Sequence, residues 1–474
     1  MKKFNKFLVF ISLLSCFSCS DFLEVEEVGK VSTPVYFSDL DGIKSAIPGA
    51  YSSVYKYYNS EFYIYPQVAG DLLDLVPTNE GVKVLDQYNY ISDASQEAST
   101  VGHIWTNAFH ALANINNILK YQPELLNKYP KNHKELEQIK AQALFLRALV
   151  HFDLVRTYAQ NYTYTPDASH LGVPVLLSSP GAEDNIGRSS VKKVYDQILS
   201  DLHEANDIFE NEGTDTNQTQ PYFGSDIAAK ALLSRVYLYM EDWEKSKTYA
   251  QQVLLEVDLT SHDAYVDMFK TSGPSQEAIF TLSGIKKNSF IKRFYSTQEP
   301  SAFASKKLQA MFTEPSDVRL ELLQNVEGSE NLITLKYFRP EEAQLNGSDL
   351  PVLRASEMVL NLAEANANLG LLEEAKNNVK TIQARALGVP ETSIVINAVT
   401  QQEVLEVISI ERAKELCFEG QRFFDITRRH KDLERSPQTT SNVEHIAYPS
   451  NLFVLPIPLK EMNTNHNMIQ NEGY

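Results

Sequence analysis

Apolar residues recur at helical spacing along most of this chain, and this pattern constrains the fold more than any other feature. Several of the segments end at helix-stop signals, such as Gly370 or the Gly388-Val389-Pro390 run. The nine segments predicted as helices are 43–57, 101–121, 136–158, 191–209, 227–240, 243–257, 355–369, 372–387 and 404–418. We therefore expect a fold dominated by α-helices.

The composition is that of a globular protein with room for a large core. The chain has 474 residues, of which 43% are hydrophobic and 22% charged. Its 61 acidic and 43 basic side chains give a formal charge of −18, so it repels phosphate backbones and no nucleic-acid partner is expected. Only 3 cysteines are present, which excludes a scaffold held together by disulfides.

The helical pattern is interrupted between residues 257 and 350. Segments 278–282 and 333–337 have the character of short strands and are separated by Gly, Ser, Asn and Pro. We predict a loop-rich insertion with a few short strands over 257–350.

Two of the predicted helical pairs resemble each other. Each of the apolar and small residues compared in the second pair lies the same number of sequence positions after its counterpart in the first pair. The first set is Leu233, Ser234, Tyr237, Ser246, Ala250 and Val253, and the second is Leu362, Ala363, Asn366, Ala375, Val379 and Ile382. Small side chains at a helix crossing are typical of tetratricopeptide-like pairs, which we expect within 101–255 and 351–390, with 138–158 forming another. A generic helical hairpin is the alternative.

The amino terminus has the features of an export signal. Lys2, Lys3 and Lys6 precede an apolar run over 7–14, which is too short to span a bilayer. Residues 13–21 (LLSCFSCSD) resemble a bacterial lipoprotein cleavage site, with Cys19 as the predicted lipidated residue and Cys16 as the alternative. We predict a signal peptide over 1–18, a lipidated tether over 19–40 and a single domain over 41–474.

A charged motif near the carboxy terminus lies on an apolar helical stripe. Glu411, Glu415 and Arg422 continue the stripe begun by Val404 and Ile408. Buried charges must be paired, because an isolated one is destabilising. Since acids and bases alternate here, we expect an ion-pair network that fixes the last long helix against the core. A pair of catalytic acids is the alternative.

No sequence motif indicates catalysis. HExxH, GxSxG, P-loop and CxxC patterns are absent, and no His, Cys and acid cluster has metal-ligand spacing. Ser190 fits SxxK but stands where a helix cap is expected. We therefore predict that the chain is not an enzyme and uses no cofactor or metal. A glycosidase pair of acids and calcium at Asp71 and Asp74 stay open as alternatives.

Residues 410–428 (IERAKELCFEGQRFFDITR) resemble the carboxy-terminal signature of the SusD/RagB family of Bacteroidetes lipoproteins. Other segments resemble that family in the same order along the chain. They are 21–23 (DFL), 143–158 (ALFLRALVHFDLVRTY), 172–175 (GVPV), 351–365 (PVLRASEMVLNLAEA), 382–386 (IQARA), 455–458 (LPIP) and 471–474 (NEGY). The resemblance implies a SusD-like fold on a scaffold of tetratricopeptide-like pairs.

The same resemblance implies a function. SusD-like proteins are anchored by lipid to the outer surface of the outer membrane. They bind nutrient oligosaccharides and act as the lid of a SusC-like TonB-dependent transporter. RagB-like members, which bind peptides, are the alternative, and a lipid-anchored glycoside hydrolase is a weaker one.

A glycan site needs aromatic faces beside polar groups that read hydroxyls. Two loop-like stretches supply both, and the second adds basic side chains that suit an anionic ligand. The predicted ligand-binding residues are Tyr88, Tyr90, Phe290, Arg293 and Tyr295. Packing beneath a loop is the alternative for each aromatic ring. By contrast, the residues expected to be structural are Tyr51, Tyr55, Tyr58, Trp105 and Trp243.

Overall fold

The computed structural model describes residues 32–76, 84–95, 100–179, 181, 184–213, 221–271, 275–284, 289–338 and 348–474. The predicted signal peptide and both candidate lipidation sites, Cys16 and Cys19, lie outside these residues.

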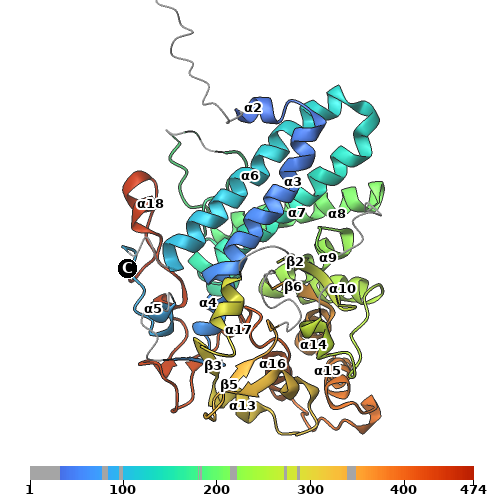
Figure 1. Cartoon of the computed structure of the whole chain (residues 1–474), viewed down its shortest axis with the longest axis vertical. Coiled ribbons are helices and arrows are strands. Elements are labelled where there is room, and N and C mark those ends of the chain that lie inside the picture. The colour runs from blue at the N-terminus through green and yellow to red at the C-terminus, as the bar shows by residue number, and fades with distance from the viewer. Residues whose placement is uncertain are drawn as a thin grey trace, which may run out of the picture.

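All nine predicted helices are present, and Figure 1 shows their arrangement. They are α3 (Leu40–Tyr57), α6 (Thr100–Lys128), α7 (His133–Tyr158), α8 (Val191–Glu212), α9 (Asp226–Tyr239), α10 (Trp243–Leu254), α14 (Ala355–Asn368), α15 (Leu372–Leu387) and α16 (Gln401–Glu415). The shorter helices are α2 (Thr33–Tyr36), η2 (Tyr58–Phe62), α4 (Tyr63–Val68), α5 (Leu85–Tyr88), η3 (Pro130–Asn132), η4 (Tyr162–Tyr164), α11 (Asp267–Lys270), α12 (Phe290–Phe294), α13 (Lys306–Met311), η6 (Val318–Leu322), η8 (Glu391–Ser393), α17 (Arg422–Arg428), η9 (Asn451–Phe453) and α18 (Leu459–Thr464).

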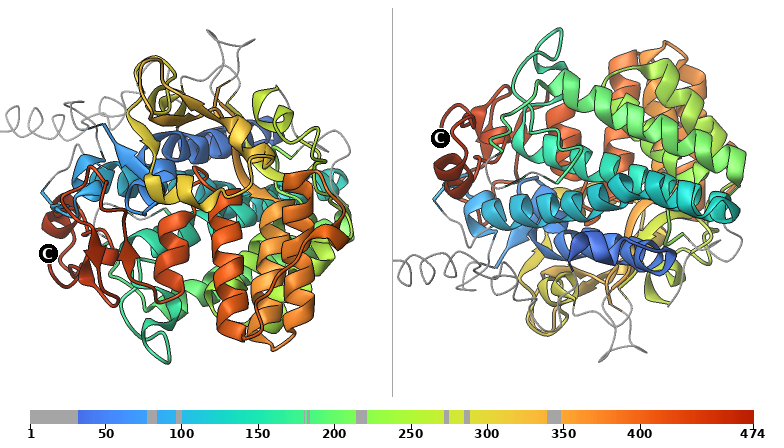
Figure 2. Two further views of the ribbon diagram at one scale, coloured as in Figure 1. Left: turned by 90° about the horizontal axis from the view of Figure 1, so that it is seen from below. Right: turned by 90° about the horizontal axis from the view of Figure 1, so that it is seen from above.

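Helix α7 runs through the centre of the core. Its residues from Ala141 to Tyr158 are all buried, polar ones included, as expected for a helix enclosed on every side. Helices α3, α6 and α8 pack around it, and α3 lies alongside α6 in the right-hand view of Figure 2. Buried charges on α7 are paired: the Arg147 guanidinium donates to both carboxylate oxygens of Asp201 at 2.8 and 2.7 Å.

The two helical pairs predicted from the repeated pattern are α9–α10 and α14–α15, and they pack against each other through α10 and α14. Ser234 and Ser246 face each other across the first pair. Each hydroxyl donates to the backbone carbonyl of the other residue, at 3.1 and 3.0 Å. In the second pair, the Asn366 amide donates to the Asn378 side-chain oxygen at 3.0 Å. Small and short polar side chains thus allow both close crossings, as predicted.

The insertion carries four of the eight strands in the described ranges, and the eight form four two-stranded antiparallel ribbons. They are β1 (Leu73–Leu75) with β3 (Ala302–Ala304), β2 (Ala278–Leu282) with β6 (Leu350–Arg354), β4 (Leu323–Asn325) with β5 (Leu332–Thr334), and β7 (Leu433–Glu434) with β8 (His445–Ile446). The predicted strand at 278–282 is confirmed. The one predicted at 333–337 ends early, because Lys336 turns into the core to reach Glu419 at 2.6 Å.

The segment predicted to be the end of the tether belongs to the fold. Helix α2 starts at Thr33, and Phe37 is only 6% exposed. The Phe37 ring stacks on Tyr121, with ring centres 5.0 Å apart and planes 7° apart. Asp39 then caps α3, where its side chain accepts the Gly42 N–H at 2.9 Å. The folded region therefore begins before residue 41.

Candidate ligand-binding site

Tyr88, at the end of α5, is part of the core. Its side chain is 1% exposed, and the Arg435 guanidinium covers the ring 4.5 Å from its centre. Its hydroxyl donates to Asp74 at 2.8 Å and lies 2.9 Å from the hydroxyls of Thr439 and Thr440. Tyr88 therefore follows the alternative interpretation, in which the ring packs inside the protein. In this position the ring is closed off from a sugar.

Tyr90 is half-buried, and its backbone has a positive φ of 54°. Its hydroxyl donates to the Ala69 carbonyl, so its polar end is engaged within the protein. The Arg435 guanidinium lies 5.4 Å from the ring centre. Tyr90 therefore helps to hold the segment after α5 against the core.

Only part of the second predicted stretch reaches the surface. Tyr295 is 3% exposed and stacks on Tyr337, with ring centres 5.5 Å apart and planes 17° apart. Phe290 is half-buried at the start of α12, and its backbone N–H donates to the Asn59 side chain at 3.1 Å. Arg293 is exposed and makes no ion pair with another described residue. Phe290 and Arg293 are thus the accessible residues of this second stretch.

The two stretches lie on either side of the β1–β3 ribbon. On the β1 side, Asp74 accepts the Tyr88 hydroxyl. On the β3 side, the Ser301 N–H donates to the Phe294 carbonyl at 3.0 Å, and the Ser301 carbonyl accepts the Val76 N–H at 3.0 Å. The ribbon therefore joins segments that are about two hundred residues apart in sequence into one end of the molecule.

The acids considered for calcium have protein partners. Asp71 accepts two hydrogen bonds from Arg422, at 2.6 and 2.8 Å, and lies 2.8 Å from the Lys307 ammonium. Burial works against ionisation of Asp71, but the two cations outweigh it and lower its pKa from 3.8 to about 2. Asp74 accepts hydroxyls from Tyr88 and Thr439. No group of three potential metal ligands occurs among the described residues.

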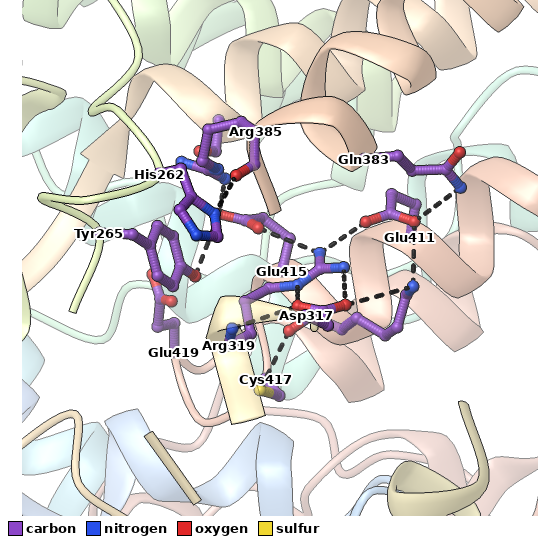
Figure 3. A network of polar contacts seen from close by, with 12 residues as sticks. His262, Tyr265, Asp317, Arg319, Gln383, Arg385, Glu411, Glu415, Cys417 and Glu419 are labelled. Atoms are coloured by element: carbon purple, nitrogen blue, oxygen red, sulfur yellow. Dashed lines mark hydrogen bonds and ion pairs between the residues drawn. The ribbon is translucent and has the colours of Figure 1, made fainter. Parts of the chain in front are cut away.

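The charged motif forms a buried ion-pair network between α16, the insertion and β6, part of which Figure 3 shows. At its centre is Glu415, which is 0% exposed and accepts from Arg354 at 2.7 Å, Arg385 at 2.7 Å and Arg319 at 3.2 Å. The connected ion pairs join five carboxylates to five cations, so the formal charge of the network is zero. The acids are Glu277, Asp317, Glu411, Glu415 and Glu419, and the bases are Arg319, Lys336, Arg354, Arg385 and Lys414.

The structural interpretation of this motif is confirmed. Burial opposes the ionisation of Glu415, but Arg385, Arg354 and Arg319 outweigh it and hold its pKa well below its usual range. A carboxylate so held cannot serve as a general acid near neutral pH. Arg422 also lies on the predicted stripe, but its partner is Asp71, in the segment between α4 and β1. Gly420 makes the turn between the helices with a φ of 72°.

An aromatic groove of about 350 Å³ lies between α6, α18 and the segment around Asp184. Trp105 forms its inner wall, packed against Phe109 and Tyr158 at ring-centre distances of 4.6 and 4.9 Å. The indole N–H of Trp105 donates to Glu461 at 3.4 Å. Trp105 is thus buried as predicted, and half-buried Phe109 is the ring that the groove exposes.

Trp243 was predicted to be structural, but its side chain is only half-buried. The sequence pattern placed it within a helix, and the structure places it half-buried at the first turn of α10. No signal in the sequence separates it from Trp105, because the exposure of each ring depends on distant segments.

Two family models match most of the chain. The model described as "SusD family" matches residues 332–474, and the one described as "Starch-binding associating with outer membrane" matches residues 21–238. No helix in the described ranges is both long enough and apolar enough to cross a membrane.

Relatives and solved structures agree with these matches. "SusD-like protein P2" of Formosa agariphila is 23% identical over the full length of both chains. The "Starch-binding protein SusD" of Bacteroides thetaiotaomicron is 31% identical over 27% of this chain and 22% of its own length. A SusD superfamily structure from Bacteroides thetaiotaomicron has a TM-score of 0.80 at 25% identity, covering 91% of this chain and 99% of that one. A putative sugar binding protein from Bacteroides vulgatus shares the fold, with a TM-score of 0.80 at 23% identity over 92% of this chain and 99% of that one.

Motifs in order along the sequence, the helical fold and both family models therefore agree: this chain belongs to the SusD/RagB family.

Proposed function

We propose that this protein is a cell-surface lipoprotein that captures nutrient oligosaccharides and passes them to a SusC-like TonB-dependent transporter, over which it closes as a lid. The observation that carries this proposal is the match of residues 21–238 to the family described as starch-binding and associating with the outer membrane. The lipid would be attached at Cys19, with Cys16 as the alternative.

The buried charges support capture rather than cleavage. A glycosidase needs two carboxyl groups that face the bond to be broken. The acids of the carboxy-terminal motif are instead enclosed, and each of them is paired with a cation.

The accessible ligand contacts in this proposal are Phe290 and Arg293. The half-buried Phe290 ring offers an apolar face, and the exposed Arg293 guanidinium offers hydrogen-bond donors on the same short helix. Tyr88, Tyr90 and Tyr295 support the surrounding segments from below. The buried rings of Tyr88 and Tyr295 and the bonded hydroxyl of Tyr90 fix the shape of this end of the molecule.

Calorimetric titration with a panel of oligosaccharides tests the proposal. The panel contains maltoheptaose and gluco-, xylo-, manno- and uronic-acid oligosaccharides, with mixed peptides as a separate arm. We expect at least one glycan to bind, and the double variant Phe290→Ala/Arg293→Ala to weaken that binding about tenfold, which is about 1.4 kcal/mol. The matched control is Tyr36→Ala/Lys131→Ala, an exposed aromatic and an exposed cation away from α12, and it should bind as the wild type does.

The other possible outcomes of this titration would replace or limit the proposal. Binding of peptides with no glycan binding would replace the proposal by the RagB-like alternative. Release of shortened sugars from a bound glycan would replace it by a hydrolase. Wild-type affinity in the Phe290→Ala/Arg293→Ala variant would show that these two residues are not the contacts.

The anchor and the partner need separate measurements. Mass spectrometry of the mature protein should find an acylated amino-terminal Cys19, labelled when cells grow with tagged palmitate. Purification from detergent-solubilised outer membranes should recover a TonB-dependent barrel with the wild type. Mature protein without acyl chains would contradict the anchor, and recovery without any barrel would contradict the lid role.

A further inference from the structure

A cavity of about 780 Å³ opens where α14, α16, the end of α17 and the turn between α9 and α10 meet. This volume lies within the range of ~300–1,000 Å³ that is usual for small-molecule sites. None of these elements carries a residue predicted to bind the ligand, so the cavity is separate from the end of the molecule that bears α5 and α12.

Trp243 forms one wall of the cavity. It stands at the first position of α10, where the Asp242 side chain caps the helix by accepting the Lys245 N–H at 3.2 Å. Across the described segments, its indole N–H has no hydrogen-bond partner and its ring touches no other aromatic ring. Trp105, in contrast, has both kinds of partner. A half-buried indole without partners offers a flat apolar face and a free donor to a ligand.

Polar side chains with unused hydrogen-bonding capacity also line the cavity. Arg429 is half-buried and is held in place by the Leu405 carbonyl, which accepts one N–H at 3.0 Å, and by Glu364 at 3.8 Å. Its other N–H groups have no hydrogen-bond acceptor among the residues with described positions. The Glu406 carboxylate and the Gln402 amide are exposed on α16, and neither has a hydrogen-bond partner among those residues. The charge of Glu406 does act on the Arg429 guanidinium.

The charges that line the cavity disfavour an anionic ligand. Four acids stand against three bases, so an anion gains no net attraction. The acids are Glu241, Glu364, Glu403 and Glu406, and the bases are Arg428, Arg429 and Lys431. Glu364 and Arg428 also neutralise each other through two hydrogen bonds of 2.7 and 2.8 Å. The remaining groups mix donors and acceptors around one aromatic face, which is the combination that binds hydroxyl-rich molecules.

We propose that this cavity is a second carbohydrate-binding site, which takes a short neutral oligosaccharide. Trp243 stacks on a sugar ring, while Arg429, Glu406 and Gln402 form hydrogen bonds with its hydroxyls. The choice of a glycan as ligand rests on the proposed function, but the location of the site does not depend on Phe290 or Arg293.

Tryptophan fluorescence reports on this cavity directly, because the chain has only 2 tryptophans. In a Trp105→Phe variant, Trp243 is the sole tryptophan. The probes are maltoheptaose and each neutral oligosaccharide of the panel. We expect one of them to change the Trp243 emission and to protect it from acrylamide quenching. The same response should persist in the Trp105→Phe/Phe290→Ala/Arg293→Ala variant.

Affinity measurements in the otherwise unaltered protein give a second readout if Trp105→Phe does not fold. Trp243→Ala should weaken binding of the responding sugar about tenfold, whereas Trp243→Phe should keep most of the affinity. Glu244→Ala, an exposed neighbour on α10, is the control and should have no effect.

Three results would overturn the inference. One is calorimetric binding of a neutral glycan without any Trp243 response or any effect of Trp243→Ala, which would leave the proposed function intact. A second is loss of the Trp243 response in the Phe290→Ala/Arg293→Ala background, because the signal would then come from the other site. The third is a panel in which no neutral glycan binds; binding of a uronic-acid oligosaccharide alone would then leave the proposed function intact, whereas no glycan binding at all would contradict both proposals.

Discussion

Replacing Glu415 by glutamine tests whether the buried network stabilises the fold through mutual neutralisation. One Glu415 oxygen accepts from Arg354 and Arg385, each at 2.7 Å, and the other accepts from Arg319 at 3.2 Å. Glutamine has nearly the same shape but carries no charge. It keeps one acceptor oxygen and places an NH₂ group opposite a guanidinium. The network, neutral in the wild type, then has one uncompensated positive charge in the core.

The expected loss of stability is large. Removing one partner from a buried ion pair costs about 3–5 kcal/mol, because the remaining charge stays buried without compensation. We expect Glu415→Gln to lower the free energy of unfolding by this amount. For a chain of this length, the entropy of unfolding translates it into about 1 °C of melting temperature per kcal/mol. Urea-induced unfolding is therefore the more sensitive assay.

A second change should restore part of the stability. Arg385→Met removes one of the three guanidiniums that face Glu415, so the Glu415→Gln/Arg385→Met pair is neutral again. We expect the two single effects to be non-additive by roughly 1–3 kcal/mol. The control is Glu373→Gln, since Glu373 is 76% exposed in its pair with Lys376. Its change in unfolding free energy should stay below about 0.5 kcal/mol.

Two results would refute this reasoning. If Glu415→Gln were as mild as Glu373→Gln, or if the double variant were simply additive, charge balance would not be what the network contributes. If a folded Glu415→Gln protein lost glycan binding, the motif would have a role in function and not only in structure.

Two further predictions concern other buried groups. Asp71 and Asp425 have pKa values lowered from 3.8 to about 2, since their cationic partners outweigh burial. A carboxyl whose pKa is depressed in the folded state stabilises the fold at pH values above its unfolded pKa. The free energy of unfolding should therefore fall as the pH drops from about 4 to about 2. The expected loss is about 2 kcal/mol for each group. Urea unfolding across this range should show a smaller pH dependence in Asp71→Asn, and an unchanged dependence would contradict the assignment. Tyr88→Phe removes a hydroxyl that forms hydrogen bonds with Asp74 and two threonines. It should destabilise the protein by about 1–3 kcal/mol while glycan affinity stays unchanged. A selective loss of affinity would make Tyr88 a ligand contact instead.

The helices and their pairing could be predicted from the sequence because that information is local. Helical periodicity repeats within each segment, and the small residues at the Ser234–Ser246 crossing lie 12 positions apart. The burial of Glu411 and Glu415 also followed from their places on an apolar stripe. The partner of Arg422 could not be predicted, because Asp71 is 351 residues away in the chain.

The candidate sites were harder to predict for the same physical reason. Whether a loop aromatic faces solvent depends on what covers it, and Tyr88 is covered by Arg435 and Thr439, both far along the chain. Trp243 shows the converse, since it lines a cavity to which the distant elements α14, α16 and α17 also contribute. Residue type identified rings able to bind a sugar, but their exposure is a property of the tertiary structure.

The most direct test of capture without cleavage combines binding and product analysis on the purified wild-type protein. A glycan that binds in calorimetry is incubated at saturation, and its chain length is then measured by mass spectrometry. We expect the oligosaccharide to be recovered at its original length. Shorter fragments, or the absence of any glycan that binds, would contradict it.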